Sequence, residues 1–229
     1  SRRFKAGNLK MVVSREGEIE TMRFSVIIPT HNAEKFISEG LESIKNQSFT
    51  NYELIVVCDR CTDKTKEIAE SYGAKTLEVD YGRDGLSRNA GLDIAQGEYI
   101  IFLDHDDAIL HEFVFSEIDK KLKAENDPDL LICSFIWHGV CYAKPRAKNG
   151  DFYPSVWNKI WSRKYISNHR FTDVYSISDF YFHKEMMAVP HRTVEWDFPI
   201  VFYNYLCEGS ISLEMGRTIR GTKAVWGDG

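Results

Sequence analysis

Long hydrophobic runs are missing from this sequence: no segment approaches the apolar length of a membrane-spanning helix, and the N-terminal residues lack the apolar core of a signal peptide. We therefore expect a cytoplasmic protein. Cysteine is also scarce, with five residues among 229. An odd number of cysteines in a chain of this length does not suggest a disulfide framework. Cys58 and Cys61 form one C-x-x-C pair without the second pair of a zinc site, which leaves plain thiols or a redox role.

Positive charge is in short supply overall, since the formal net charge is -5 at pH 7. This balance argues against nucleic acid as a partner, because such proteins present a basic face to the phosphates. The basic residues that do cluster lie near the start, where residues 1–23 hold six Lys or Arg and three Glu. We interpret residues 1–22 as a basic arm, either a solvated terminus or a weak contact with the inner face of a membrane.

Apolar residues are frequent enough for a substantial core, at 43% of the chain. In the first 135 residues, short apolar runs alternate with segments of helical periodicity. The runs expected to form strands are 24–28, which Pro29 should end, 53–57, 75–79, 99–103 and 130–135. Helical patterns include Ile37, Leu41 and Ile44, then Ile68 and Ala69, then residues 85–96 and 111–125. This alternation predicts an α/β fold with a mostly parallel central sheet and helices on both faces.

Polar clusters follow three of the predicted strands. They are residues 30–32, 58–60 and 104–107. Because the carboxyl ends of parallel strands meet at one edge of a sheet, we expect the three clusters to form one ligand site.

The last of these clusters is the most acidic. Asp104, Asp106 and Asp107 would repel one another unless a cation neutralised them, and carboxylate oxygens suit Mg²⁺ or Mn²⁺. The alternative is an acidic turn that caps the next helix. His105 could also bind a metal, but in an extended segment its side chain should point away from its neighbours, which favours a structural role.

Four segments, in order, carry a family resemblance over about eighty residues. They are residues 25–34 (SVIIPTHNAE), 57–65 (VCDRCTDKT), 87–91 (SRNAG) and 97–107 (GEYIIFLDHDD). Together they resemble the nucleotide-binding half of family 2 glycosyltransferases, which implies a GT-A, Rossmann-like fold and a nucleoside diphosphate sugar as donor, most often a UDP-sugar.

The resemblance also implies roles for single residues. The residues implied to bind the nucleotide sugar are Pro29, Thr30, Asn32, Glu34, Asp59, Arg88, Asp104 and His105. Asp59 would accept a hydrogen bond from the base, and Asp106, with Asp104, would hold the Mn²⁺ or Mg²⁺ that bridges the diphosphate. Cys58 stands where the family usually has Asp, and Arg60 and Cys61 replace Gly and Ser, so the base pocket is altered.

The second half resembles the family more weakly. Residues 156–161 (VWNKIW) are similar to a W-N-K segment that often precedes the acceptor-side acid, and Ser178-Asp179 is similar to an E-D pair. Asp179 is therefore the first candidate for the general base. The further candidates are Asp173, then Glu195 or Asp197.

The resemblance divides the chain. We expect one GT-A domain over residues 23–215, with a nucleotide-sugar-binding half at 23–110 and a less regular acceptor half at 111–215. Residues 216–229 would be a tail or a lid over the diphosphate. The basic residues of that segment are Arg217, Arg220 and Lys223. Aromatic residues are dense after residue 136 and either form core or line a sugar site.

The sequence therefore predicts a metal-dependent, inverting transfer of a sugar to a glycan, a lipid-linked or a protein acceptor. One alternative is a nucleotide-sugar-binding module with a degraded site. Another is a nucleotidyltransferase, although residues 29–34 lack the glycine-rich basic loop that such enzymes usually carry.

Overall fold

The computed structural model describes residues 12–13, 19–137, 141–146, 150–175 and 177–204. None of the helices in these ranges is both long and apolar enough to cross a bilayer. The elements are β1 (Val12–Val13), β2 (Ile19–Glu20), β3 (Phe24–Thr30), α1 (Ile37–Lys45), β4 (Tyr52–Asp59), α2 (Thr65–Ser71), β5 (Lys75–Val79), α3 (Asp84–Ile94), β6 (Tyr99–Phe102), β7 (Ala108–Ile109), α4 (Val114–Ala124), β8 (Leu130–Trp137), β9 (Cys141–Ala143), β10 (Lys159–Ser162), α5 (Arg163–Ile166), α6 (Ser178–Ala188) and β11 (Thr193–Tyr203).

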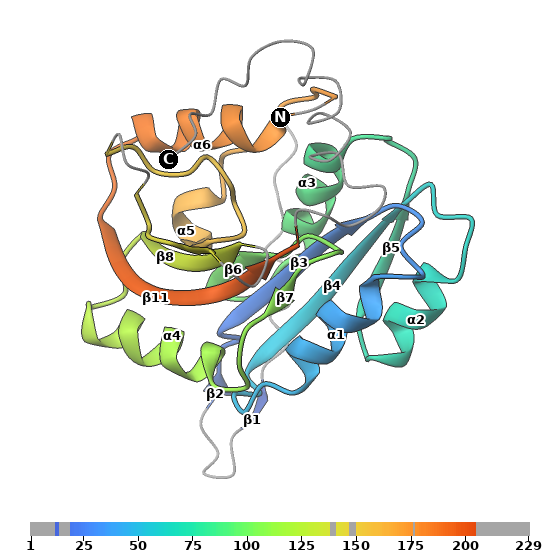
Figure 1. Ribbon diagram of the computed structural model, residues 1–229, viewed down its shortest axis with the longest axis horizontal. Helices are drawn as coiled ribbons and strands as arrows, with labels where there is room; N and C mark the ends of the chain where they lie inside the picture. Colours follow the sequence, from blue (N-terminus) through green and yellow to red (C-terminus); the bar gives the residue numbers. More distant parts are fainter. Residues whose placement is uncertain (1–11, 14–18, 138–140, 147–149, 176, 205–229) are drawn as a thin grey trace.

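One large sheet organises the described part of the chain (Figure 1). Its strand order is β5-β4-β3-β6-β10-β8-β11-β7, with β9 paired to β8 beside this path. Strands β5, β4, β3 and β6 are parallel, β10 lies antiparallel between β6 and β8, and β11 is parallel to β8. The predicted α/β fold with a mostly parallel sheet is confirmed.

Strand β3 is longer than the sequence suggested. The prediction that Pro29 ends the strand is wrong, because pairing with β4 continues to Thr30, which lies opposite Cys58. Pairing with β6 has already ended at Ile27, so the missing N–H of Pro29 leaves no gap in a ladder on that side. Pro29 and Thr30 therefore lie at the carboxyl end of β3, beside the loops of the site.

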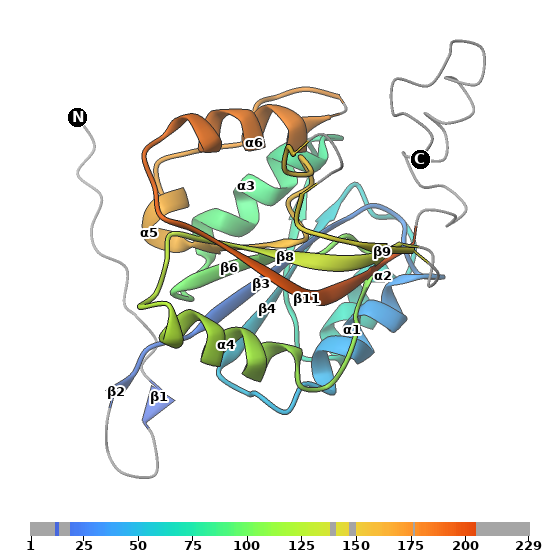
Figure 2. The same ribbon diagram turned by 60° about the vertical axis from the view of Figure 1, so that its left-hand side comes forward.

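Two hydrophobic clusters cover the two faces of the sheet. Alternate residues of β3 point to opposite sides, so Val26 and Ile28 join one cluster and Ile27 joins the other. Helices α1, α2 and α4 cover the first face, and α3, α5 and α6 cover the second (Figure 2). The prediction of helices on both faces is confirmed.

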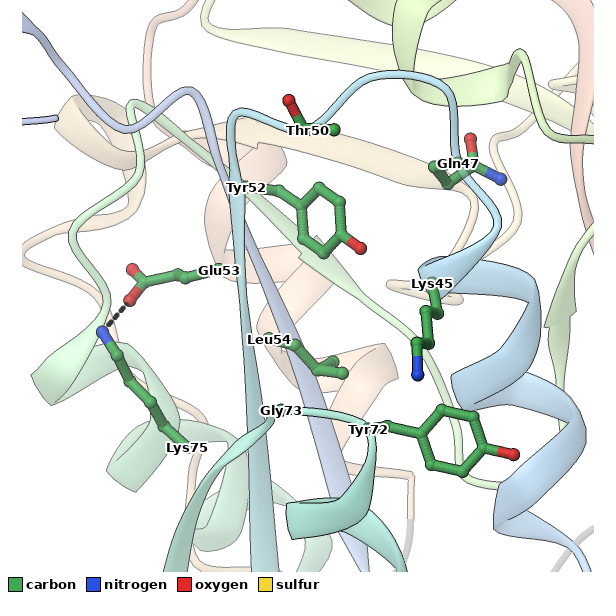
Figure 3. A pocket seen from close by; sticks show the side chains of 9 residues that line it. All are labelled: Lys45, Gln47, Thr50, Tyr52, Glu53, Leu54, Tyr72, Gly73 and Lys75. Atoms are coloured by element: carbon green, nitrogen blue, oxygen red, sulfur yellow. Dashed lines mark hydrogen bonds and ion pairs between the residues drawn. The ribbon is translucent and has the colours of Figure 1, made fainter. Parts of the chain in front are cut away.

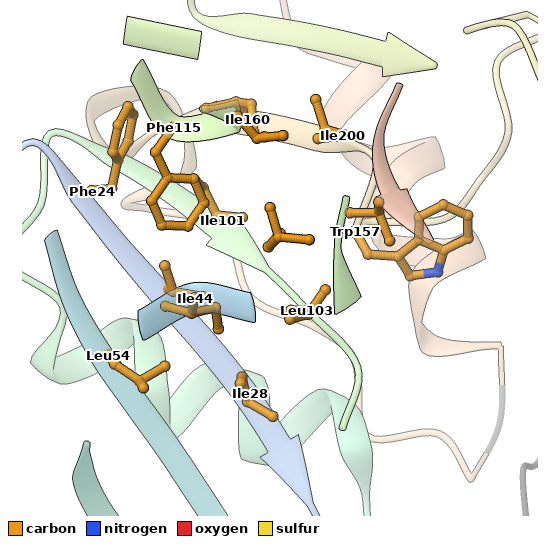
Figure 4. Close-up of a cluster of buried hydrophobic side chains, with 14 of the residues drawn as sticks. Phe24, Ile28, Ile44, Leu54, Ile101, Leu103, Phe115, Trp157, Ile160 and Ile200 are labelled. Atoms are coloured by element: carbon orange, nitrogen blue, oxygen red, sulfur yellow. The ribbon is translucent and has the colours of Figure 1, made fainter. Parts of the chain in front are cut away.

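The first cluster also joins the early and late parts of the chain. Figure 4 shows Ile44 of α1 and Phe115 of α4 near Ile101, with Trp157 and Ile200 from the later part beside them. Residues before and after position 110 thus share one core, and burying such side chains contributes about 1.5–3 kcal/mol each.

Most aromatic side chains of the second half are core residues. Trp161 is completely buried, and Trp157 is 6% exposed and stacks on Tyr203 with ring centroids 4.7 Å apart. Five rings among the described residues after 136 differ, with exposed fractions from 36% to 76%: Trp137, Tyr142, Tyr175, Phe180 and Tyr181. The core interpretation therefore holds for most of this group.

Helix α3 packs unusually close to β3. A Cβ atom on Gly91 would lie 2.5 Å from Cγ2 of Ile27, so only glycine permits this approach. The close packing fixes the position of Arg88, one helical turn earlier, beneath the carboxyl edge of the sheet.

Candidate active site

The loops after β3 and β4 are joined to each other by side chains predicted to bind the nucleotide. The Thr62 N–H donates to Oδ1 of Asn32 at 2.7 Å, and the Lys64 N–H donates to Oε2 of Glu34 at 3.1 Å. In return, the Glu34 N–H donates to Oδ2 of Asp63 at 3.0 Å. The side chains of Asn32 and Glu34 therefore hold the two loops together, using oxygens that could otherwise accept hydrogen bonds from a ligand.

Arg60 occupies a backbone position that favours glycine. Its φ is 54°, in the left-handed region, which explains why the family pattern has Gly there. The Arg60 side chain forms an ion pair with Asp80 and packs against Gly82, where an added Cβ would lie 2.5 Å from Nη1. These contacts hold the loop in this conformation.

The carboxylate of Asp59 accepts four hydrogen bonds from the protein itself. Oδ1 accepts the N–H groups of Tyr81 at 2.9 Å and Gly82 at 3.0 Å, and Oδ2 accepts the Arg83 N–H at 3.1 Å and the Ser87 hydroxyl at 3.0 Å. Burial alone would raise the pKa of Asp59, but these donors hold it below its ordinary value. Asp59 thus anchors the loop before α3, and its contact with a base stays a prediction.

The C-x-x-C pair lies at the same edge. Cys58 and Cys61 line a cavity of ≈ 380 Å³ at the carboxyl ends of β4 and β5, and both are free thiols. A hydrogen bond between the Cys58 and Cys61 side chains, with the N–H of Asn32, lowers the pKa of Cys61 to about 7. The same hydrogen bond, together with burial, raises the pKa of Cys58. A redox role stays a prediction.

Arg88 is the electrostatic centre of the site. It is 3% exposed and binds three carboxylates. Nη1 lies 2.5 Å from Asp84 and 3.1 Å from Asp179, and Nη2 lies 2.7 Å from Asp104. Burial alone would lower the pKa of Arg88, but the carboxylates raise it. One guanidinium therefore joins an acid of the predicted metal cluster to the predicted general base.

Ser178, which replaces the Glu of the family pattern, belongs to this network. It is 1% exposed, and its hydroxyl donates to Oδ2 of Asp84 at 2.8 Å. A glutamate at this position would place a fourth carboxylate next to Arg88, whereas the hydroxyl adds a hydrogen bond without charge.

Asp179, in the first turn of α6, is the acid that reaches Arg88 among the described residues of the second half. Its side chain is 23% exposed, and Oδ2 accepts the Val156 N–H at 3.4 Å. Burial raises the pKa of Asp179 to about 6; Arg88 opposes this shift, and Asp104 and Asp84 add to it. At pH 7 most of the carboxylate is therefore charged and able to accept a proton.

Residues 104–107 carry an excess of negative charge. Burial raises the pKa of Asp106, with His105 opposing and Asp104 adding to the shift. Burial, Asp104 and Asp106 raise the pKa of Asp107, which is 1% exposed. Oδ1 of Asp107 accepts the Asn204 N–H at 2.9 Å, while Oδ2 has no hydrogen-bond partner among the described residues.

This donor set fits a divalent cation. Carboxylate oxygens are the ligands that Mg²⁺ and Mn²⁺ prefer, and a positive charge would relieve the repulsion that adds to the effect of burial on these pKa values. Within the described ranges, no three His, Cys, Asp or Glu side chains are arranged to hold a metal by themselves. A cation here would need further ligands, as is usual for Mg²⁺, which is typically held by one or two carboxylates and by phosphates.

The other candidates for the base lie outside the hydrogen-bond network of Asp179. The Asp173 side chain is 69% exposed and lies 3.4 Å from Nε of Arg83. Glu195 pairs with Arg146 at 2.7 Å. Asp197 accepts the Ser134 hydroxyl at 2.7 Å and that of Tyr142.

Sequence reasoning missed Asp84, which lies four residues before Arg88. That spacing places the two side chains on the same face of a helix and is the signal that could have found the pair. The predicted lid residues Arg217, Arg220 and Lys223 lie outside the described residues.

A second cavity lies at the other end of the parallel strands, where β4 and β5 begin. It measures ≈ 350 Å³ and contains the ion pair of Glu53 with Lys75 (Figure 3). Its walls come from the amino ends of β4 and β5, so it is remote from the acids of residues 104–107.

The fold and the acidic edge together define a glycosyltransferase of the GT-A type. The profile of Glycosyl transferase family 2 matches residues 25–189. The chain belongs to glycosyltransferase family 2, and the resemblance in its motifs is confirmed.

Two relatives show what the chain is similar to. It is 44% identical over 99 residues to the poly(ribitol-phosphate) beta-N-acetylglucosaminyltransferase TarS of Staphylococcus aureus, a match that covers 40% of this chain and 17% of the relative. It is 37% identical over 125 residues to a poly(ribitol-phosphate) beta-glucosyltransferase of Bacillus spizizenii, covering 48% of this chain and 19% of the relative. The chain thus spans less than a fifth of the length of these curated relatives.

Solved structures agree on the fold. S. aureus TarS 1-349 in complex with UDP-GlcNAc superposes with a TM-score of 0.71 at 25% identity, over 84% of this chain and 61% of that one. The same protein in complex with UDP gives 0.69 at 26% identity, over 80% and 60%. A mannosyltransferase of Pyrobaculum calidifontis gives 0.67 at 18% identity, over 85% and 60%, which bears on the fold alone.

Proposed function

We propose that this chain transfers a sugar from a UDP-sugar to an acceptor hydroxyl with inversion, and that it needs a divalent cation to do so. One observation carries the proposal: Arg88 binds Asp104 at 2.7 Å and Asp179 at 3.1 Å. An acid of the predicted metal cluster and a base of suitable pKa are thereby held at one site. The UDP-GlcNAc complex of a structure 25% identical to this chain supports a UDP-sugar as donor.

The proposed mechanism is a single displacement. Asp179 accepts the proton of the acceptor hydroxyl as the oxygen attacks the anomeric carbon, and the bond to the leaving diphosphate breaks on the opposite face. One displacement of this kind inverts the anomeric centre. A pKa of about 6 suits Asp179 to this task, because the group is charged at neutral pH yet basic enough to hold a proton.

The cation would be held by Asp106 and Asp104. Mn²⁺ or Mg²⁺ supplies Lewis-acid stabilisation of charge on a leaving diphosphate. The residues of this chain contribute the negative site that attracts it. Arg88 restrains Asp104 through the ion pair at 2.7 Å.

For the acceptor we propose a chemical class and not a single compound. The printed names of the two relatives refer to poly(ribitol-phosphate), which supports a glycan or a related polymer among the glycan, lipid-linked and protein acceptors we consider. Within this proposal, residues 23–110 bind the donor and residues 111–215 face the acceptor. The protein would work in the cytoplasm or at the inner face of a membrane.

Release of UDP from UDP-GlcNAc, in the presence of Mn²⁺ and an acceptor screen, tests the proposal. Asp179→Asn should lower transfer by about 10²–10⁴-fold and leave UDP binding by calorimetry nearly unchanged. Asp106→Ala should remove transfer and weaken the Mn²⁺-dependent part of UDP binding. Asp173→Asn is the matched control and should keep full activity. A fully active Asp179→Asn enzyme would refute the assignment of the base.

A binding module without turnover is the second candidate, and the position of Asp59 favours it. All four hydrogen bonds to that carboxylate come from the protein itself, and Cys58 replaces the neighbouring acid. Calorimetry with UDP-GlcNAc and Mn²⁺, followed by a hydrolysis assay, separates binding from turnover. Binding without any release of UDP would favour the module.

A further inference from the structure

Lys159 is a completely buried charge in the core of the second half. It lies in β10, and its ammonium group donates three hydrogen bonds. The acceptors are the carbonyl oxygens of Tyr153 at 2.6 Å and Ser155 at 2.5 Å, and Oδ1 of Asn158 at 3.0 Å. All three protons of the ammonium group therefore have an oxygen partner.

Core stability does not account for this lysine. Its neighbours in the strand, Ile160 and Trp161, are equally buried and apolar. A well-packed apolar side chain in place of a buried charge is often neutral or stabilising, because the charge must be removed from water. Burial lowers the pKa of Lys159 to about 7, with Asp179 and Cys133 opposing the shift, which shows what desolvation costs this group.

The contact with Ser155 explains what the charge does. The carbonyl oxygen of Ser155 and the N–H of Val156 belong to one planar trans peptide group, so they point in opposite directions. The oxygen accepts from Lys159, and the N–H donates to Oδ2 of Asp179 at 3.4 Å. The hydrogen bond on one side of the peptide polarises the group and strengthens the donor on the other side.

Asp179 is held from two directions as a result. Arg88 lies 3.1 Å from Oδ1, and the Val156 N–H faces Oδ2. The charged groups around this carboxylate are Arg88 and Asp84 of α3, Asp104 after β6 and Lys159 itself. Cys133 of β8 and His183 of α6 also interact with Lys159.

We propose that Lys159 is a positioning residue for Asp179 and acts through the peptide group that joins Ser155 to Val156. The ammonium group fixes the direction of that peptide, and the peptide N–H fixes the orientation of the carboxylate and favours its charged form. The inference rests on the proposed function, in which Asp179 accepts the proton of the acceptor.

Lys159→Met provides the test, because methionine fills the space but cannot donate. We expect kcat to fall about 10–100-fold, as a small misplacement of a catalytic group does, while the Kd of UDP stays within about twofold. The acid limb of the kcat–pH profile should move to higher pH, because Asp179 loses part of the hydrogen bond that favours its charge.

Ile132→Val is the matched control, since Ile132 lies opposite Lys159 in the register of β8 and β10. It should lower thermal stability without moving the acid limb. Should Lys159→Met not fold, Val156→Pro removes the N–H directly and should produce the same shift. In the double variant the two effects should not add.

Asp179→Asn separates the two possible failures. An active Asp179→Asn enzyme would show that Asp179 is not the base, and would refute the proposed role of Lys159 as well. An inactive Asp179→Asn enzyme, combined with an unmoved acid limb in Lys159→Met, would overturn the inference on Lys159 alone.

Discussion

Two buried arginines, at opposite ends of the parallel strands, each hold three carboxylates. Arg23, just before β3, binds Glu98 at 2.6 Å, Asp119 at 2.7 Å and Asp127 at 2.6 Å. Arg88 holds its three acids at the carboxyl ends of the strands, at 2.5–3.1 Å. The count of ion pairs is the same, yet only one cluster lies at the edge where the site is.

The surroundings make the difference. At the Arg23 cluster, Lys123 adds a second cation 2.8 Å from Asp119, and Glu98 and Asp127 are 42% and 52% exposed. The acids around Arg88 are only 23–29% exposed, and two more carboxylates follow Asp104. In the first cluster two of the three acids are solvated, and two cations face the three carboxylates. The second has a buried excess of negative charge, the condition that shifts pKa values at functional sites.

Removing each arginine should give the largest contrast. Arg88→Met should reduce transfer by at least about 10³-fold, because it releases both Asp104 and Asp179. Arg23→Met should cost about 2 kcal/mol of unfolding free energy, because three carboxylates lose a charged hydrogen-bond partner, while kcat of the folded fraction changes less than about threefold. Urea unfolding and initial rates measure the two effects. An equal loss of kcat in Arg23→Met would break the comparison.

Removing one acid from each cluster should change stability in opposite directions. The folded pKa of Asp179, about 6, exceeds its ordinary value of 3.8, so this group favours folding below that value and the benefit is lost as pH rises through 6. Asp179→Asn should therefore be more stable than the native protein by about 1–2 kcal/mol near pH 8, and the gain should vanish near pH 4.

Asp119→Asn is the counterpart at the other cluster. It removes the partner of Arg23 and Lys123, and we expect it to lower stability by about 1–2 kcal/mol near pH 8. Denaturant midpoints at the two pH values measure both variants. Two changes of the same sign would show that the clusters do not differ in charge balance.

Added Mn²⁺ should give the smallest effect. A cation that binds the folded protein at Asp106 and Asp104 should stabilise it by about 1 kcal/mol even without donor, through mass action. A thermal scan with and without Mn²⁺ measures the shift. Asp106→Asn should abolish it and Asp119→Asn should retain it; an equal shift in both variants would place the cation elsewhere.

Much of the fold could be predicted from local patterns. The alternation of apolar runs and helical periodicity predicted the parallel strands and the helices on both faces, because burial on both sides leaves a direct mark on the sequence. The antiparallel insertion of β10 left no such mark. Its residues meet β6 and β8 through pairings across about 30–60 positions, which short-range patterns do not encode.

The sequence named candidate residues for the site but could not predict their contacts. Arg88 and Asp179 are 91 positions apart in the chain, and their approach depends on how α3 and α6 pack on the same face. Three donors to Asp59 come from a loop more than 20 residues later and the fourth, Ser87, comes from α3, so its carboxylate looked available for a ligand. Both features follow from tertiary packing and not from residue types.

The loop that Asp59 anchors has a consequence for the donor. Three successive backbone N–H groups, of Tyr81, Gly82 and Arg83, converge on one anion just before a helix begins. Many α/β proteins use such a nest to cradle a phosphate. In this protein the carboxylate of Asp59 occupies the nest. The start of α3 is thus closed to a diphosphate, and the groups that balance phosphate charge have to come from other parts of the edge.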